Sequence, residues 1–141
     1  MKNLVKVANT ALINSENEIL VLKRSSKFKN PLLWGFPGGL VEENEAEESA
    51  AKRELFEETS ITSEKYSITA HKNFLIGKLN KSIEITLFKA VVLSSVNVQI
   101  DLNEHIEYKW VPLTQVMTMK DIIHDIPLML AKLLEKSDFV I

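Results

Sequence analysis

The sequence predicts an α+β fold, an α/β/α sandwich in which helices pack on a mixed sheet. Two pairs of apolar, β-branched runs are each joined by a short turn sequence, which is typical of β-hairpins. One strongly helical stretch lies between these pairs, and a leucine-rich helical pattern follows the last strand. Because sheet faces and helix stripes are buried against one another, this order favours helices packed on a sheet. No repeat or linker divides the chain, so we expect one domain over residues 1–141.

The first half of the chain is expected to form a hairpin, a glycine turn and a helix. Residues 4–13 and 19–22 are apolar and β-branched, and Asn14-Ser15-Glu16-Asn17 between them has the composition of a turn. A Pro37-Gly38-Gly39 turn follows, where glycine lets the backbone approach another group closely. We expect the helix after this turn to close at Ser60.

The second half is expected to form another hairpin, a last strand and a final helix. Residues 67–79 and 82–93 flank Asn80-Lys81, which indicates a hairpin with a tight turn. Residues 107–111 are expected to form the last strand, and Pro127 to lie in the first turn of the final helix. The apolar stripe expected on that helix consists of Leu128, Leu130, Leu133 and Leu134.

Composition limits the classes of function. The chain has 45% hydrophobic and 26% charged residues, no cysteine and a formal net charge of −2. Lysines and arginines are not clustered, so there is no electrostatic footprint for a nucleic-acid polymer. Without cysteine there is no thiolate nucleophile and no cysteine zinc site, and no apolar run approaches the roughly 18 residues of a membrane span. We therefore expect a protein of the cytoplasm that binds neither nucleic acid nor membrane.

Four glutamates are expected to share one face of the central helix. At the helical period, Glu54, Glu57 and Glu58 fall within about a third of the circumference, and Glu47 lies on the same side. Like charges at this spacing destabilise an isolated helix, so the cluster favours a bound cation. Oxygen ligands suit a hard ion such as Mg²⁺. The alternative is an acidic helix face exposed to solvent.

The spacing of the charged residues resembles the signature box of the Nudix hydrolases. Gly39 is followed after five residues by Glu45, and after seven more by Arg53-Glu54-Leu55-Phe56-Glu57-Glu58-Thr59-Ser60-Ile61. One position departs from the family pattern, because Ser60 stands where the family usually has glycine, a residue suited to a left-handed helix cap. The family cleaves nucleoside diphosphates linked to another moiety, and the resemblance implies the Nudix fold.

The resemblance also implies a site with Mg²⁺ as cofactor and Mn²⁺ as a substitute. No arrangement of serine, cysteine and histidine offers a covalent nucleophile, so metal-activated water fits better. The implied metal ligands are Glu57 and Glu58, then Glu54 and the backbone oxygen of Gly38. Glu54 is alternatively the base that positions water, and Arg53 acts with Glu45 in the outer shell. The catalytic residues that we expect are Arg53, Glu54, Glu57 and Glu104.

Further candidates for the site lie outside the box. Glu104 precedes the last strand and resembles the loop acid that many family members use as metal ligand or general base, or to contact substrate; the alternative is a solvated loop acid. Arg24 ends the second strand, at a position that often contacts substrate phosphate in the family. Phe28, like Trp34 and Phe74, is a candidate for stacking on a nucleobase, and core packing is the alternative.

Sequence marks of substrate subgroups favour one branch of the family. Ile76 stands where ADP-ribose pyrophosphatases tend to carry proline, and Lys78 and Leu79 stand where dinucleoside polyphosphate hydrolases tend to carry tyrosine. Residues 34–39 are similar to the MutT-like branch, which hydrolyses nucleoside triphosphates to monophosphate and pyrophosphate. We expect this activity on a nucleotide substrate, from a monomer or homodimer. The alternatives are hydrolysis of ADP-ribose or a nucleoside diphosphate sugar, and a nucleotide-sensing module without turnover.

Overall fold

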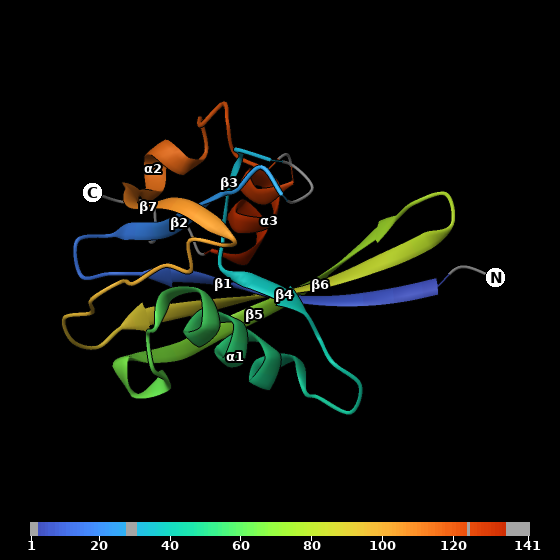
Figure 1. Cartoon of the computed structure of the whole chain (residues 1–141), viewed down its shortest axis with the longest axis horizontal. Coiled ribbons are helices and arrows are strands. Elements are labelled where there is room, and N and C mark those ends of the chain that lie inside the picture. Colours follow the sequence, from blue (N-terminus) through green and yellow to red (C-terminus); the bar gives the residue numbers. More distant parts are fainter. Residues whose placement is uncertain (1–2, 28–30, 124, 135–141) are drawn as a thin grey trace.

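A seven-stranded mixed sheet runs through the centre of the molecule, with helices on both of its faces (Figure 1). The structure is a computed structural model that describes residues 3–27, 31–123 and 125–134. In chain order the elements are β1 (Asn3–Ile13), β2 (Glu18–Arg24), β3 (Trp34–Gly35), β4 (Gly38–Leu40), α1 (Glu47–Thr59), η1 (Ser63–Lys65), β5 (Tyr66–Gly77), β6 (Lys81–Val92), β7 (His105–Pro112), α2 (Leu113–Val116) and α3 (Ile126–Leu133). Helix α1 packs on one face of the sheet, and α2 and α3 pack on the other. The predicted α/β/α arrangement is therefore confirmed.

The strand order places β1 in the middle of the sheet. The order is β3-β2-β1-β6-β5, with β4 paired to β1 and β7 paired to β2. β1 is parallel to β6, from Asn3 opposite Lys81 to Ile13 opposite Val91, and the other strand pairs are antiparallel. Both predicted hairpins are present, as β1 with β2 and β5 with β6. The mixed sheet that the sequence predicts is thus built around the first strand of the chain.

The glycine turn is held against the middle of β1. The β1–β2 pairing is confined to Ile13 and Ile19, and further along β1 the residue Asn9 faces Gly38 on β4. The Thr10 N–H donates a hydrogen bond to the Pro37 carbonyl at 2.9 Å. Because α1 follows this turn directly, the helix is placed over the same strand.

The buried face of α1 consists of small residues. Ala50 and Ala51 pack against Ala8 of β1 and Phe88 of β6. Alanine side chains add little thickness between a helix and a sheet, so the backbones approach closely. Leu55, further along the helix, is fully buried in a second cluster on the same face of the sheet. The helix therefore brings its glutamates close to the backbone of the glycine turn.

The final helix buries most of the predicted stripe, since Leu130 and Leu134 are buried and Leu133 packs against the same cluster, but not Leu128. Pro127 lies in its first turn, as expected, and Leu130 is fully buried. Leu128, however, is 62% exposed, and Ile126 and Met129 are buried instead. The helix begins at Ile126, and residues three and four positions later share its inward face. In the described part of the chain no helix is long and apolar enough to cross a membrane.

The β5–β6 hairpin extends with the start of β1 beyond the helices as an arm (Figure 1). At its tip the Lys78 N–H donates to the Lys81 carbonyl at 2.7 Å, which closes the turn. Asn3 pairs with Lys81, so β1 supports the arm along its whole length. The arm thereby continues the sheet face on which α3 packs.

Candidate active site on the acidic helix

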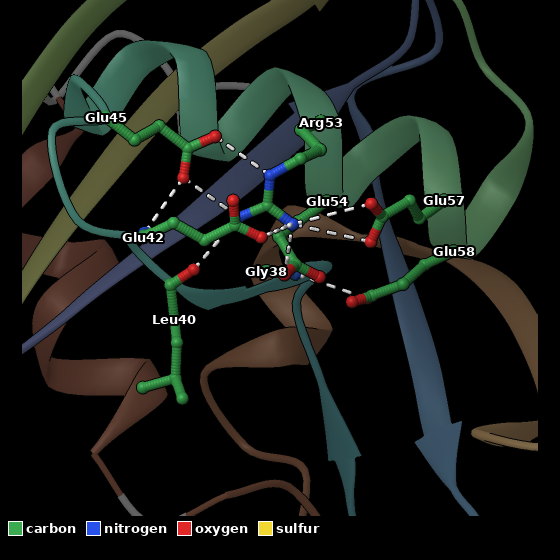
Figure 2. A network of polar contacts seen from close by, with 8 residues as sticks. All are labelled: Gly38, Leu40, Glu42, Glu45, Arg53, Glu54, Glu57 and Glu58. Atoms are coloured by element: carbon green, nitrogen blue, oxygen red, sulfur yellow. Dashed lines mark hydrogen bonds and ion pairs between the residues drawn. The ribbon is translucent and has the colours of Figure 1, made fainter.

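Arg53 of α1 is the centre of the polar network that joins the helix to the loop before it (Figure 2). Its Nε donates to Glu45 Oε2 at 2.8 Å and its Nη2 donates to Glu45 Oε1 at 3.0 Å. Nη2 also donates to the Leu40 carbonyl at 3.0 Å. The forked bond to Arg53 is the main cause that lowers the pKa of Glu45 to about 2. Arg53 and Glu45 thus fix the path of the chain between the glycine turn and the helix.

The remaining nitrogen of Arg53 faces the helix carboxylates. Nη1 donates to Glu54 Oε1 at 3.0 Å, and both Glu57 oxygens lie 3.4 Å from it. Because two other nitrogens of the guanidinium bind Glu45, Glu57 is contacted by Nη1 alone, at a longer distance than Glu54. The hydrogen bond to Glu45, and then that to Glu54, raises the pKa of Arg53 further above its ordinary value. One guanidinium therefore orients several acids without neutralising them all.

Glu58 is the most buried glutamate of the helix, with 3% of its surface exposed. The Gly38 N–H donates to its Oε1 at 3.2 Å (Figure 2). Burial, followed by the negative charge of Glu54, raises the pKa of Glu58 to about 9. Without a cation beside it, the Glu58 side chain is therefore protonated at neutral pH, and a bound cation would favour loss of that proton.

The two glycines of the turn permit this approach of strand and helix. A Cβ atom on Gly39 would lie 2.6 Å from the Glu54 carboxyl carbon, and one on Gly38 would lie 2.4 Å from the Ala8 carbonyl oxygen. The Asn9 amide donates to the Phe36 and Pro37 carbonyls at 3.4 and 3.5 Å, which ties the turn to β1. Sequence reasoning missed the role of Asn9, although a polar residue inside an apolar strand was a usable signal.

The loop before β7 brings Glu104 toward the same acids. The Ser25 N–H donates to the Glu104 carbonyl at 2.9 Å, which fixes the loop beside the end of β2. The pKa of Glu104 is raised by burial and then by the charges of Asp101, Glu54 and Glu57. Glu104 is therefore within electrostatic reach of the helix, while its roles as ligand, base or substrate contact stay predictions.

Arg24 ends β2 next to this loop. It pairs in register with His105, whose pKa is lowered to about 4 by burial and then by the Arg24 charge. His105 is thus neutral at physiological pH, and its buried Nδ1 has no hydrogen-bond partner among the residues that the structure describes. Arg24 itself lines the large cavity described below. Its predicted contact with substrate phosphate remains consistent with this position.

The donor atoms of the helix face suit a hard cation. Glu54, Glu57 and Glu58 offer oxygen atoms only, which is the chemistry that Mg²⁺ prefers. The negative charge of Glu54 raises the pKa of the buried Glu58 carboxyl, and a divalent ion bound beside both would stabilise the ionised form of Glu58. Within residues 3–27, 31–123 and 125–134 the acidic and histidine side chains do not converge as a ready cluster of three metal-binding groups. The ligand assignment, including Gly38, therefore stays a prediction.

A cavity of about 710 Å³ opens beside the glycine turn on the α3 side of the sheet. One end is formed by Asn9, Arg24 and the two glycines, and the floor is mostly aliphatic. Among the described lining residues the aromatic one is Phe36, which is 6% exposed and was not predicted. Phe28 lies outside the described residues. The cavity extends from the glycine turn to the arm.

The other two aromatic candidates belong to the core. Trp34 is 3% exposed, and the Lys109 ammonium lies 4.4 Å from the centre of its ring. Phe74 packs against the apolar cluster on the α3 side of the sheet. Neither residue lines the cavity. The structure thus favours core packing over nucleobase stacking for both.

The sheet, the glycine turn and the braced acidic helix define a class of α/β/α domains that present several carboxylates from one helix beside a glycine turn. The family model of the NUDIX domain matches residues 3–132, and the chain belongs to this family. The match extends from β1 into α3 and so covers the whole described sheet. The family that the signature spacing indicated is therefore confirmed.

Comparison with known proteins gives similarity to named members of the family. Over 64 residues the chain is 45% identical to human nucleoside diphosphate-linked moiety X motif 6, which is 45% of this chain but 20% of the human protein. The structure of a MutT protein from Methanosarcina mazei Go1 is similar with a TM-score of 0.79 and 25% identity, covering 93% of each chain. The C. elegans Ap4A hydrolase binary complex is similar with a TM-score of 0.77 and 28% identity, covering 91% of this chain and 93% of that one.

Proposed function

We propose that the chain is a Mg²⁺-dependent pyrophosphohydrolase that acts on a nucleoside diphosphate linked to another group. The first candidate substrate is a nucleoside triphosphate, cleaved to monophosphate and pyrophosphate. The observation that carries this proposal is the buried Glu58 carboxyl, held by the Gly38 N–H beside Glu54 and next to a large cavity. Membership of the Nudix family and similarity to a MutT protein support it.

In this proposal the residues of the site have separate roles in metal binding, positioning and proton transfer. Glu57, Glu58, Glu54 and the Gly38 carbonyl would hold Mg²⁺, which when bound masks phosphate charge and lowers the pKa of a coordinated water. Arg53 keeps the Glu54 and Glu57 carboxylates oriented through hydrogen bonds of 3.0 and 3.4 Å. Glu54 or Glu104 would accept the proton of the attacking water. The raised pKa of Glu104 brings its basicity closer to neutral pH, which suits a general base.

Arg24 would bind the substrate on the cavity side. Its guanidinium stays charged and presents several donors in a plane, which suits a phosphate group. It lines the same cavity as Gly38 and Gly39, so a phosphate there would lie between the helix acids and the arginine. The position of Arg24 thus supports binding of a phosphorylated substrate with its scissile group at the acidic helix.

The two alternatives differ in substrate and in turnover. Because the chain is similar to an Ap4A hydrolase, nucleoside diphosphate compounds with a larger second moiety are alternative candidate substrates. They include ADP-ribose and nucleoside diphosphate sugars. A nucleotide-sensing module would bind nucleotide without hydrolysing it. The full set of acids supports turnover, since binding alone does not require several carboxylates on one helix.

A substrate panel tests the proposal. Release of phosphate or pyrophosphate is measured with nucleoside triphosphates, oxidised purine triphosphates, ADP-ribose and nucleotide sugars, in Mg²⁺ and in chelator. Metal-dependent turnover of one class supports the hydrolase and names its substrate. If no compound is hydrolysed, yet a nucleotide raises the melting temperature, the sensing module replaces the hydrolase.

A further inference from the structure

The cavity beside the glycine turn has a second charged end. Lys78 and Lys81, on either side of the β5–β6 turn, line it, as does Arg24 at the first end. The one carboxylate among the lining residues is Asp125, just before α3. The cavity therefore carries three cations against one acid, in a chain whose formal net charge is −2.

The two charged ends are far apart. Along β1, Gly38 is paired with Asn9 and Lys81 with Asn3, six residues away. At about 3.3 Å per residue this separates the two backbones by roughly 20 Å. The four-carbon stem of a lysine can span only part of this separation, which leaves room of the order of a nucleoside between the two ends. A single phosphoryl group cannot contact both the acidic helix and the arm.

The surroundings of the two lysines favour an anionic ligand over simple solvation. Ile76, Ile83 and Ile85 line the cavity beside them, so the charges border an aliphatic surface. Among the described residues neither lysine forms an ion pair, whereas Lys6 pairs with Glu47 on the α1 side at 3.6 Å. Lys81 is also only partly exposed. An anion bound between the two ammonium groups would supply the charge that the chain itself does not.

We propose that Lys78 and Lys81 bind a second phosphate group of the substrate, on the side of the nucleoside away from the scissile bond. The substrate class is then a nucleoside diphosphate derivative or triphosphate that also carries a phosphate on its ribose. This inference rests on the proposed function, because it places the scissile group at the acidic helix. The aliphatic middle of the cavity contacts the nucleoside, and each end binds one anionic group.

Matched substrate pairs test this assignment. Steady-state kinetics in Mg²⁺ compare NADPH with NADH, and adenosine 5′-triphosphate 3′-phosphate with ATP. We expect KM to be about tenfold lower for the member with the extra phosphate, because a charge-assisted hydrogen bond is worth about a factor of ten or more. Lys78→Gln and Lys81→Gln should each remove most of this preference by raising KM for the member with the extra phosphate.

Lys72→Gln is the matched control, since Lys72 lies on β5 of the same hairpin but does not line the cavity. It should leave the KM ratio of each pair unchanged. Equal KM values within the wild-type pairs, or an equal rise in KM for both members in the lysine variants, would overturn the inference while leaving the hydrolase intact.

Binding measurements separate this inference from the proposed function. Calorimetry with adenosine 3′,5′-bisphosphate and AMP needs no turnover. If no pair is hydrolysed but the bisphosphate binds about tenfold more tightly and Lys81→Gln abolishes the difference, the hydrolase proposal fails and the lysine site stands. Equal affinity for the two compounds refutes the lysine site in either case.

Discussion

Glu57 is the most accessible of the three acids predicted to bind metal, with 51% of its side chain exposed. Glu57→Gln keeps the volume of the side chain and removes one charge from the predicted metal face. Loss of an outer-shell partner alone costs about 10–100-fold in metal affinity or activity, so we expect a loss of about 100-fold or more here. Turnover of the substrate that the panel identifies measures this, and the melting temperature in chelator should stay close to wild type.

Glu48→Gln is the control for Glu57→Gln. Glu48 lies on the same helix and forms an exposed ion pair with Lys52 at 3.3 Å. Exposed pairs of this kind contribute little to stability. At the helical period Glu48 lies on the opposite side of α1 from Glu57, away from any substrate contact proposed for Glu57. If Glu48→Gln lowered turnover as much as Glu57→Gln, the loss would reflect general helix charge, and the metal face would be assigned wrongly.

The two glycines of the turn should respond differently to alanine. On Gly39 the new Cβ meets the end of the flexible Glu54 side chain, which can move aside, whereas on Gly38 it meets the β1 backbone. We therefore expect Gly39→Ala to lower turnover at least about tenfold, because Glu54 is displaced, with little change in stability. Gly38→Ala should destabilise the fold by about 1–3 kcal/mol.

Urea unfolding and kinetics on the two glycine variants together check this difference. A Gly39→Ala protein with wild-type turnover would mean that the position of Glu54 does not matter for the reaction. A Gly38→Ala protein with wild-type stability would mean that β4 can move away from β1 without cost.

At the scale of a single element, the end of α1 stores backbone strain. Ser60 adopts the left-handed conformation with φ of 64°, and its N–H donates to the Phe56 carbonyl at 2.8 Å. The helix thus keeps the cap geometry of the family without the family's glycine. Ser60→Gly should stabilise the protein by about 0.5–1 kcal/mol, because relief of the left-handed strain exceeds the added freedom of the unfolded chain.

The control for the cap is Ser60→Ala, which retains a Cβ atom and therefore the strain. Urea midpoints of the two variants separate conformational strain from loss of the hydroxyl. An alanine variant stabilised as much as the glycine variant would remove strain as the explanation.

Local patterns could predict most of the elements. Alternation and turn residues identified both hairpins, since these depend on neighbours in the chain. The inward face of α3 was assigned wrongly at Leu128, because a stripe of leucines does not determine where a helix begins. The Arg53 fork to Glu45 was implied by the family pattern but not by helix spacing, because Glu45 precedes the helix.

At the scale of the whole molecule, the acid pair links stability to pH and to metal. The pKa of Glu58 rises from 4.5 to about 9, so between these values the folded chain holds a proton that the unfolded chain releases. Stability in chelator should therefore fall as pH rises, by up to about 1.4 kcal/mol per pH unit. Glu104, whose pKa is also raised, acts in the same direction.

The clearest range for this test lies above about pH 6.5. The lowered pKa of His105, about 4, gives the opposite slope, but only below the ordinary histidine value. Melting curves in chelator from about pH 6.5 to 9 should show a decline that Glu58→Gln flattens, and Mg²⁺ should stabilise the wild type more at the alkaline end. An unchanged slope in Glu58→Gln would mean that another group holds the proton.

From the sequence, the residues of the acidic face could be predicted, but the shape of the site could not. The identities of the acids, Arg53 and the glycine turn follow from spacing along the chain. The cavity does not, because it is formed by β1, the arm and α3, which lie far apart in sequence. The same is true of the positions of Lys78 and Lys81, because only the sheet register places Lys81 opposite the start of β1 and Lys78 across the turn from it.

The parallel pairing of β1 with β6 also has a consequence for folding kinetics. β1 can pair with β6, its longest partner, only after α1 and the whole of β5 have been made, since Asn3 pairs with Lys81 and Ile13 with Val91. Such distant contacts are formed late, because the loop between them must be closed first. β1 and the glycine turn can pair earlier, as neighbours in sequence. The acidic face would then form before the cavity, and the newly made chain would bind a cation before it could hold a nucleotide.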